Sequence, residues 1–586
     1  MRHLFYFLLL AVFTSFTDPI IPKKPILNYP KGYFQSPVAH TIELAGTFGE
    51  LRPNHFHSGI DISPGRKLSN EPIYAAAEGY VSRIQVQAGG YGQALYITHP
   101  NGYTTVYGHL EKLAFSIDTF LKKKQYTSES FEQNLILQPQ DLPILRGQEI
   151  GIMGNRGHSA GQHLHFEIRE TETDNPINPL LFGFNVSDNI APTINALKVY
   201  LLNDKKEIVD TKILDVVRRG KDYAILGDTV FVASNQVAFA LKTYDKQDGK
   251  SGSNGVYSIE MNQNDSLLFQ FTTEKFGFNE TRYLNAHLDY TAQMSRQGFF
   301  NRTFLLPGNQ LSMYENVVNN GIITMNDGVK KITLKSTDAA GNATTLQFYL
   351  KNKNFIINSK PKSYNYFLPF NEPSLINTEG AKFFFSKGSF YENVYLNFAQ
   401  TTEGGTYGTY SPTYHMHDAQ TPLHYLMTVS IKPVALPDSL RKKAFIAFCP
   451  RGETSIYNCG GGWSDEGYLV GKNNKFGRYC IMIDQTPPKI TPIRFQYDMR
   501  KFSKMSFRIR DNIETVGGGE GLKYRAEVDG AWILMEFDGK SDILYHQFDD
   551  FMDKSQHEII GAEHTFRLEV TDNRGNSSVL EGKFKR

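Results

Sequence analysis

The sequence predicts an all-β (mainly β), multidomain protein that begins with a compact antiparallel β-sheet domain. Its 42 Phe and 32 Tyr favour strands, and its 49 Gly and 26 Pro favour turns. Polar and apolar residues also alternate in several short segments bounded by glycine, which is the pattern of a half-buried strand. With 586 residues the chain is long enough for roughly three to five domains.

The N-terminal residues have the pattern of an export signal. Arg2 and His3 precede an apolar run from Leu4 to Phe13, which is too short to span a bilayer. No cysteine lies near the expected cleavage point, so lipid attachment there is excluded. We therefore expect a signal peptide over residues 1–17. The mature protein is expected to be periplasmic, envelope-associated or extracellular, without a transmembrane anchor.

Residues 31–185 are predicted to form the antiparallel sheet domain. The expected strands are Ile73–Ala76, Gly79–Gln87, Gln93–Thr98, Thr104–His109, Glu149–Met153 and His163–Arg169. Glycine-rich turns separate them, and His99-Pro100-Asn101-Gly102 is a hairpin signal. Consecutive strands joined by such short turns pair antiparallel.

The strand that begins at His163 has one polar and one apolar face. His163, His165 and Glu167 share the polar face, and the three apolar residues between and after them point into a core. Two imidazoles at this spacing stand roughly 6 to 7 Å apart, so one can bind a metal ion while the other acts beside it. A His-x-His pair alone is also compatible with a plain exposed strand face.

A second candidate group lies earlier in the same domain, where His57 precedes Asp61 by four residues. A catalytic zinc ion takes three protein ligands from nitrogen and oxygen donors and keeps a fourth position open. His57, Asp61 and one of His163 and His165 supply such a set, and the spacing does not decide between the last two. His109 ends its own predicted strand, and alone it is most simply an ordinary strand-end histidine.

Together these motifs resemble those of the M23 family of zinc metallopeptidases, the lysostaphin and LytM-like peptidoglycan endopeptidases. The segments concerned are His57-Ser58-Gly59-Ile60-Asp61, Val106-Tyr107-Gly108-His109-Leu110 and Gly161-Gln162-His163-Leu164-His165-Phe166-Glu167. The resemblance extends from about Gly46 to Leu180.

The resemblance implies one zinc ion per chain, held by His57, Asp61 and His165, with His109 and His163 as catalytic histidines. Such a zinc ion lowers the pKa of a bound water toward ~7 and polarises the scissile carbonyl. Two histidines can then take the proton of the water, stabilise the oxyanion and return a proton to the leaving amine. The implied activity is hydrolysis of peptidoglycan stem-peptide crosslinks.

One departure from the family pattern is an insertion at about residues 113–145. We expect a helical turn or two at Ile117–Lys124, and we expect the insertion to wall the cleft. The alternative function is therefore a non-catalytic or gated envelope scaffold that binds cell wall or partner proteins. A second alternative is a zinc peptidase that cuts a protein.

The rest of the chain is predicted to be β-rich. Residues 186–352 and 486–586 resemble immunoglobulin-like or fibronectin-like sandwiches, because each opens on a proline-led strand and closes with an Asp-x-x-Gly-Asn turn. These turns are Asp338–Asn342 and Asp572–Asn576. The fold of residues 353–485 is not predicted beyond its β character. We expect these domains to locate the enzyme, possible partners being other envelope proteins.

Other features exclude or restrict further functions. The net charge of +2 and the absence of long Lys/Arg runs argue against nucleic-acid binding. Asp245-Lys246-Gln247-Asp248-Gly249 lacks the full pattern of a calcium loop and is interpreted as a turn. The three cysteines lie between Cys449 and Cys480, and Cys449 with Cys459 is the expected disulfide in an oxidising compartment.

Overall fold

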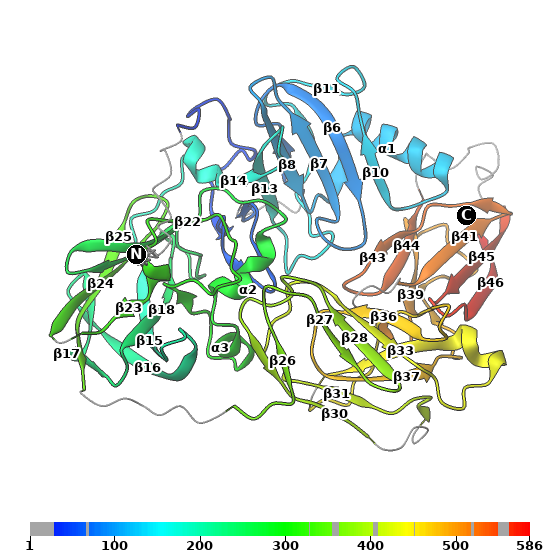
Figure 1. Ribbon diagram of the computed structural model, residues 1–586. Helices are drawn as coiled ribbons and strands as arrows, with labels where there is room; N and C mark the ends of the chain where they lie inside the picture. Colours follow the sequence, from blue (N-terminus) through cyan, green and yellow to red (C-terminus); the bar gives the residue numbers. More distant parts are fainter. Residues whose placement is uncertain are drawn as a thin grey trace, which may run out of the picture.

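The structure is a computed structural model that describes residues 28–586 except 66–69, 327, 354–361, 402–407, 451, 517–520 and 549–561. The expected signal peptide lies outside the described residues. The chain is built mainly from strands, which confirms the predicted fold class. Four regions follow one another, and the last returns to lie beside the first (Figure 1). The predicted domain limits remain predictions.

The first region, residues 28–185, is built around a sheet in the order β1-β4-β13-β8-β7-β6-β10, with β11 and β14 at its edges. All its pairs are antiparallel, as expected. Its elements are β1 (Leu44–Gly46), β2 (Leu51–Arg52), β3 (His55–Phe56), β4 (Ile60–Ile62), β5 (Pro72–Tyr74), β6 (Gly79–Val86), β7 (Gln93–Thr98), β8 (Tyr103–Gly108), β9 (Lys112–Leu113), α1 (Phe115–Ser128), β10 (Gln133–Ile136), β11 (Pro143–Ile144), β12 (Glu149–Ile152), β13 (Leu164–Glu170), β14 (Pro176–Ile177) and a 3-10 turn at Pro179–Phe182.

The insertion forms a longer helix than the sequence suggested. α1 covers fourteen residues and buries Ile117 and Leu121 in the core of the first region. β10 then pairs with β6, at the edge of the sheet opposite β4 and β13. The ring of Tyr126 lies 5.3 Å from that of Trp532, so the insertion contacts the fourth region.

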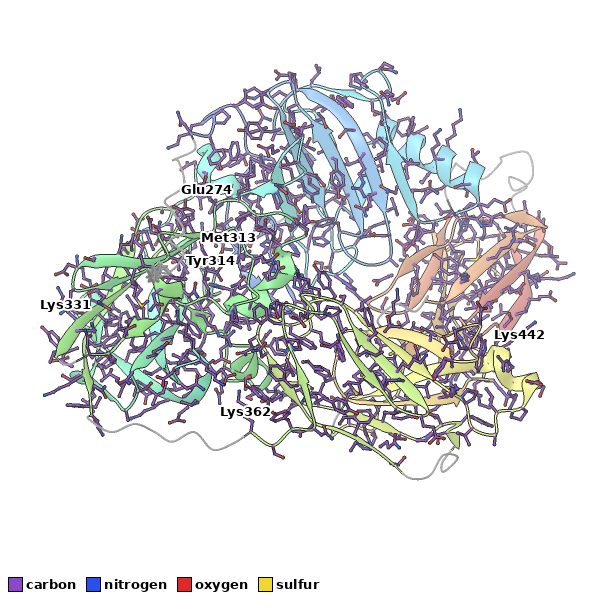
Figure 2. The ribbon with its side chains drawn as sticks, in the orientation of Figure 1. Glu274, Met313, Tyr314, Lys331, Lys362 and Lys442 are labelled. Atoms are coloured by element: carbon purple, nitrogen blue, oxygen red, sulfur yellow. The ribbon has the colours of Figure 1, made fainter. Side chains whose placement is uncertain are left out.

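The second region, residues 186–352, forms an eleven-stranded sheet around one large hydrophobic core. In this sheet β16 and β17 connect the strands β21, β18 and β15 with the strands β25, β24, β19, β20 and β22. Its elements are β15 (Thr193–Leu202), β16 (Ile208–Arg219), β17 (Asp222–Val232), β18 (Gln236–Tyr244), β19 (Ser258–Gln263), β20 (Ser266–Thr272), a 3-10 turn (Thr281–Tyr283), α2 (Leu284–His287), α3 (Tyr290–Met294), β21 (Asn301–Arg302), β22 (Tyr314–Glu315), a 3-10 turn (Asn319–Gly321), β23 (Ile323–Thr324), β24 (Val329–Thr337) and β25 (Ala343–Asn352). Met313 and Tyr314 lie inside its core, whereas Lys331 lies at the rim of the molecule (Figure 2).

The core of the second region also takes in side chains of the first. Phe48 and Phe56 are almost fully buried in it, and Phe56 packs against Phe271 and Phe276. Residue Phe56 immediately precedes His57, so the loop that carries this histidine is anchored by packing against the next region.

The third region contains two larger sheets, in the orders β27-β28-β32-β36-β35 and β30-β31-β37-β33-β34, that enclose a separate core, and a two-stranded sheet of β26 and β29. Its elements are β26 (Tyr366–Leu368), β27 (Ser374–Asn377), β28 (Ala381–Phe385), β29 (Val394–Leu396), β30 (Phe398–Gln400), β31 (Tyr414–Met416), β32 (Met427–Ile431), a 3-10 helix (Asp438–Lys443), β33 (Ala444–Cys449), β34 (Tyr457–Asn458), β35 (Gly462–Trp463), β36 (Leu469–Asn473) and β37 (Arg478–Ile483).

The fourth region, residues 485–586, consists of two four-stranded sheets around a core of its own. Its elements are β38 (Lys489–Arg494), β39 (Lys504–Arg510), β40 (Glu514–Thr515), β41 (Lys523–Val528), β42 (Ala531–Trp532), β43 (Glu536–Asp538), β44 (Ile543–Gln547), β45 (Glu563–Thr571) and β46 (Ser577–Lys585). β40 pairs with β34, which joins this region to the third.

The expected disulfide is not formed, because all three cysteines are free. Cys449 ends β33 and lies opposite Arg478. The amide of Cys459 instead bonds the carbonyl of Ile446, three residues before Cys449 on the same strand. The pairing register therefore separates the two thiols along β33, and the predicted Cys449–Cys459 bridge is wrong.

Candidate active site

Three adjacent strands of the first sheet bring the predicted metal ligands together. On β13, His165 lies directly opposite Asp61 of β4 on one side and Gly108 of β8 on the other. His57 lies in the short loop between β3 and β4. Gly59 in this loop has no room for a side chain, because a β-carbon there would overlap the backbone of β13.

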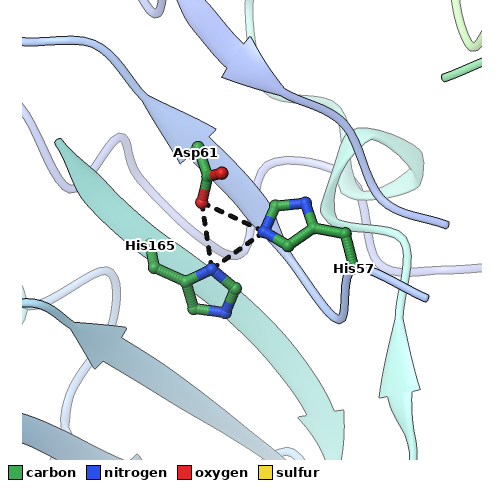
Figure 3. A group of neighbouring side chains, drawn as sticks. All are labelled: His57, Asp61 and His165. Atoms are coloured by element: carbon green, nitrogen blue, oxygen red, sulfur yellow. Dashed lines mark hydrogen bonds and ion pairs between the residues drawn. The ribbon is translucent and has the colours of Figure 1, made fainter. Parts of the chain in front are cut away.

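The three ligand atoms converge on one point (Figure 3). His57 Nε2 lies 3.0 Å from Asp61 Oδ1, which lies 3.0 Å from His165 Nδ1, and the two nitrogens are 2.9 Å apart. Donor atoms about 2.0–2.1 Å from a tetrahedral zinc ion lie about 3.3 Å from one another. The triangle is thus close to the size that such an ion requires.

The other nitrogen of each ligand histidine is held by an acceptor. His57 Nδ1 donates to the carbonyl of Thr47 at 2.8 Å, and His165 Nε2 donates to Glu167 Oε1 at 2.7 Å. A carbonyl or an ionised carboxylate can only accept, so each ring carries its proton on that side. The other nitrogens, His57 Nε2 and His165 Nδ1, face the shared point, where each can offer a lone pair to a metal ion once it carries no proton.

The two predicted catalytic histidines are oriented in the same way. His109 Nδ1 donates to the carbonyl of Arg156 at 2.7 Å, and His163 Nδ1 donates to that of Gly161 at 2.9 Å. In both rings Nε2 is therefore the nitrogen left free for the site. The rings lie 4.8 Å apart, and His163 Nε2 is 3.4 Å from Asp61 Oδ1. Among the described residues this buried Nε2 has no hydrogen-bond partner.

Burial and neighbouring charges set the protonation of the site. Burial, reinforced by the nearby His165 and His163, lowers the pKa of His109 to about 3, which keeps it neutral. Burial acts to lower the pKa of His165 too, but hydrogen bonds to Asp61 and Glu167 outweigh it and raise this pKa to about 9. Burial acts to raise the pKa of Asp61, yet the surrounding histidines hold it well below its usual value.

An inner layer of residues supports the ligands, and for most of these residues no role is predicted from the sequence. Glu167 is fully buried and accepts from His165, from the hydroxyls of Ser58 (2.7 Å) and Tyr91 (2.6 Å), and from Arg169 Nε (2.6 Å). The polar face predicted for β13 contained Glu167; its partners His165 and Arg169 lie on the same strand, whereas Ser58 and Tyr91 come from other parts of the chain. Arg52 forms an ion pair with the second oxygen of Asp61.

The fourth region reaches the site through Arg156. The guanidinium of this residue pairs with Glu536 of β43, while its carbonyl holds His109. Lys540 in turn donates to the carbonyl of Asn155. A cavity of about 290 Å³ lies between the two regions and is lined by Arg156, Glu536 and Phe131 of the insertion, among others. The loop behind His109 is therefore fixed from outside the first region.

Three neighbouring histidines do not join the site. His99 is buried and bonded on both ring nitrogens, to the carbonyl of Glu78 and to the hydroxyl of Thr105. His55 and His158 are exposed.

The fold and site define the class of the first region: a β-sheet domain with a buried His-Asp-His group suited to a metal ion. Residues 55–140 match Peptidase family M23, so this part of the chain is an M23 peptidase domain. Residues 365–484 match a Zu5-like domain. They make up most of the third region, for which only β structure is predicted from the sequence.

Curated relatives match about a fifth to a quarter of the chain. The DD-carboxypeptidase/endopeptidase Mpg of Neisseria meningitidis serogroup B is 31% identical over 154 residues, 26% of each chain. The peptidoglycan DD-endopeptidase ShyA of Vibrio cholerae is 34% identical over 114 residues, 19% of this chain and 20% of the relative. The chain spans about a quarter of the length of the curated relatives it matches.

Solved structures are similar over about a quarter of the chain. A zinc-containing peptidase from Vibrio cholerae is 21% identical, with 27% of this chain and 39% of that chain covered and a TM-score of 0.16. The catalytic domain of lysostaphin from Staphylococcus simulans is 22% identical, with 26% and 92% covered and a TM-score of 0.14. In the described part of the chain, no helix is long and apolar enough to cross a bilayer.

Proposed function

We propose that the first region is a zinc-dependent endopeptidase that hydrolyses the peptide crosslinks of bacterial peptidoglycan. The observation that carries the proposal is the arrangement of four histidines, each of which donates one ring N–H to a fixed acceptor. Their free lone pairs gather around Asp61, so two can hold a metal ion and two can handle protons beside it.

His57, Asp61 and His165 would hold the zinc ion, and the donor set of two imidazoles and one carboxylate suits it. When bound, zinc activates a water molecule and polarises the scissile carbonyl. The mechanism otherwise depends on His163 and His109. We assign to this pair of imidazoles the uptake of a proton at Nε2, the stabilisation of negative charge as an imidazolium and the return of the proton to the leaving amine.

The substrate is proposed from the relatives. Proteins named as a DD-carboxypeptidase/endopeptidase and as a peptidoglycan DD-endopeptidase match 26% and 19% of this chain. Peptidoglycan stem peptides are therefore the substrate class that we propose. Export to the periplasm or cell envelope, which the N-terminal sequence predicts, fits such a substrate.

The test compares the parent protein with His57→Ala, His163→Ala and the control His158→Ala on purified peptidoglycan. Mass spectrometry resolves the muropeptides, and bound zinc is measured in the same samples. We expect crosslinked species to disappear with the parent and the control. His57→Ala is expected to lose metal and activity, and His163→Ala to lose activity alone. An unchanged muropeptide pattern with the zinc-loaded parent would contradict the proposal.

The gated scaffold is kept as a second candidate because the ligands are deeply buried. The exposed fractions of His57, Asp61 and His165 are only 3 to 4%. If the fourth region closed the site, Glu536→Gln would raise activity by loosening its contact with Arg156. If this contact instead positions His109, the same variant would lower activity.

A further inference from the structure

Two groups of three carboxylates lie outside the peptidase site. The first consists of Asp188, Asp245 and Asp338, and the second of Asp484, Asp511 and Asp572. Within each group, one oxygen from each carboxylate lies within 4.8 Å of the others. The first group lies in the second region, the second group lies in the fourth region and in Asp484 directly before it, and the groups share no residue.

The same turn builds one corner of both groups. In Asp338-Ala339-Ala340-Gly341-Asn342, the side chain of Asn342 donates to Asp338 Oδ2 at 2.8 Å and to the carbonyl of Asp188 at 3.1 Å. In Asp572-Asn573-Arg574-Gly575-Asn576, the side chain of Asn576 donates to Asp572 Oδ2 at 2.7 Å and to the carbonyl of Asp484 at 3.0 Å. Each Asp-x-x-Gly-Asn turn therefore holds in place the segment that carries a second carboxylate of its group, Asp188 in one case and Asp484 in the other.

The other two corners also correspond. Asp188 and Asp484 lie in the segments that enter the two regions, and each accepts an amide hydrogen bond two residues along, from Ile190 at 3.1 Å and Thr486 at 3.0 Å. The third carboxylate directly follows a strand that pairs with the first strand of its region: Asp245 follows β18, and Asp511 follows β39. The chain has thus built the same triad twice.

Each group contains a buried carboxylate oxygen that lacks a partner. Within the part of the chain that the structure describes, Asp245 Oδ1 and Asp484 Oδ2 have no hydrogen bond, and the two residues are 3% and 2% exposed. Among the described residues, no Lys or Arg forms an ion pair with any of the six carboxylates. Arg574 lies close to the second group, but its guanidinium donates to the carbonyls of Ala444 and Gly461.

Like charges without a counter-ion are unfavourable in such surroundings. Burial and the neighbouring Asp188 and Asp338 raise the pKa of Asp245 to about 8. Burial and the neighbouring Asp484 raise the pKa of Asp511 to about 6. A cation would satisfy the unpartnered oxygens and remove the repulsion, whereas neutral hydrogen-bond partners for them are absent from the described residues.

We propose that each triad binds one calcium ion. All side-chain donors are carboxylate oxygens, which hard cations prefer, and neither triad contains the imidazole or thiolate ligands that zinc favours. Calcium also accepts irregular sets of six to eight oxygens, including carbonyls and water, whereas magnesium demands near-ideal octahedral geometry.

The positions of the triads indicate what the ions would do. Asp188 lies in the segment that joins the first and second regions, and Asp484 in the segment that joins the third and fourth. Asp188 and Asp245 also line a cavity of about 110 Å³ together with Thr47 and Phe48 of the peptidase region. Calcium would therefore fix two junctions, one between the first and second regions and one between the third and fourth. The first junction lies next to the Thr47 carbonyl that accepts a hydrogen bond from His57.

The test uses the full chain, freed of calcium by a chelating resin, and equilibrium dialysis against radioactive calcium. The parent is expected to bind two ions, Asp245→Asn and Asp511→Asn one each, and the double variant none. Asp248→Asn, which changes a nearby carboxylate outside the triad, is expected to keep both. If the parent binds no calcium at millimolar concentration, or if both triad variants still bind two ions, the proposal is wrong.

Thermal unfolding separates a cation site from a purely structural one. For the parent we expect calcium, but not magnesium at the same concentration, to raise the melting temperature. Without calcium, Asp245→Asn should unfold no earlier than the parent, because it removes like-charge repulsion. A melting temperature that falls equally with and without calcium would assign the carboxylates a structural role instead. Neither readout depends on zinc or on peptidase activity.

Discussion

Glu167→Gln is the substitution that tests the support of the metal site most sharply. The carboxylate accepts from His165 Nε2 through one oxygen and from Arg169 Nε through the other. An amide can satisfy only one of these donors, because its nitrogen would face the second donor. The variant therefore either releases the ring of His165 or leaves the Arg169 donor unpaired.

The size of the effect follows from these contacts. Loss of a residue that orients a metal ligand typically costs 10–100-fold in metal affinity, about 1.4–2.7 kcal/mol. Removing one partner of a buried ion pair costs about 3–5 kcal/mol of folding stability. Arg169 keeps Asp174 at 3.0 Å, so we expect the lower end of that range.

Zinc affinity is measured by competition with a chelating dye, and stability by urea unfolding. The matched control is Glu170→Gln at the end of the same strand. Its carboxylate pairs with Lys275 near the surface, so we expect a change below about 1 kcal/mol and unaltered zinc affinity. Zinc affinity of Glu167→Gln within twofold of the parent would refute the reasoning.

Three further predictions concern the same site. Because His165 has a pKa of about 9, zinc must displace a proton from this ring at any lower pH. The affinity for zinc should therefore rise by about tenfold per pH unit up to roughly pH 9 and then level off, as calorimetry can measure. Glu536→Gln should lower kcat/KM by about tenfold without loss of zinc, because Arg156 then holds His109 less firmly; this is less than the hundredfold cost of a 1 Å displacement. Gly59→Ala should destabilise the fold by about 1–3 kcal/mol in urea unfolding and weaken zinc binding, because its β-carbon would overlap β13.

Two of these variants have close controls. Glu563→Gln alters an exposed ion pair of the fourth region and should leave kcat/KM unchanged. Gly161→Ala adds a β-carbon that meets nothing within 4 Å, so it should be neutral. A pH-independent zinc affinity between pH 6 and pH 9, measured on the parent, would contradict the protonation assigned to His165.

Local patterns were sufficient to predict the sheet. The strands β6, β7, β8 and β13 lie within a residue or two of their expected limits, because alternation and turn signals are read over a few residues. Leu164 and Phe166 enter the core as the alternation predicted. The helix α1 was underestimated, since its many polar residues obscure the few that it buries.

The support of the site was beyond the reach of the sequence. Carbonyl acceptors such as those of Thr47 and Arg156 leave no mark in a sequence, because every residue has one. The pair Arg156–Glu536 and the packing of Phe56 join positions that are far apart along the chain. The Asp-x-x-Gly-Asn turns were recognised, but their carboxylate partners were not, for the same reason.

The central claim is that a metal ion at His57, Asp61 and His165 makes this chain a peptidoglycan endopeptidase. The most direct measurement strips the full chain of metal, restores one equivalent of zinc and follows crosslinked muropeptides before and after. We predict no cleavage by the stripped protein and loss of crosslinks once zinc is restored. A chain that binds one zinc ion and still leaves every crosslink intact would contradict the account.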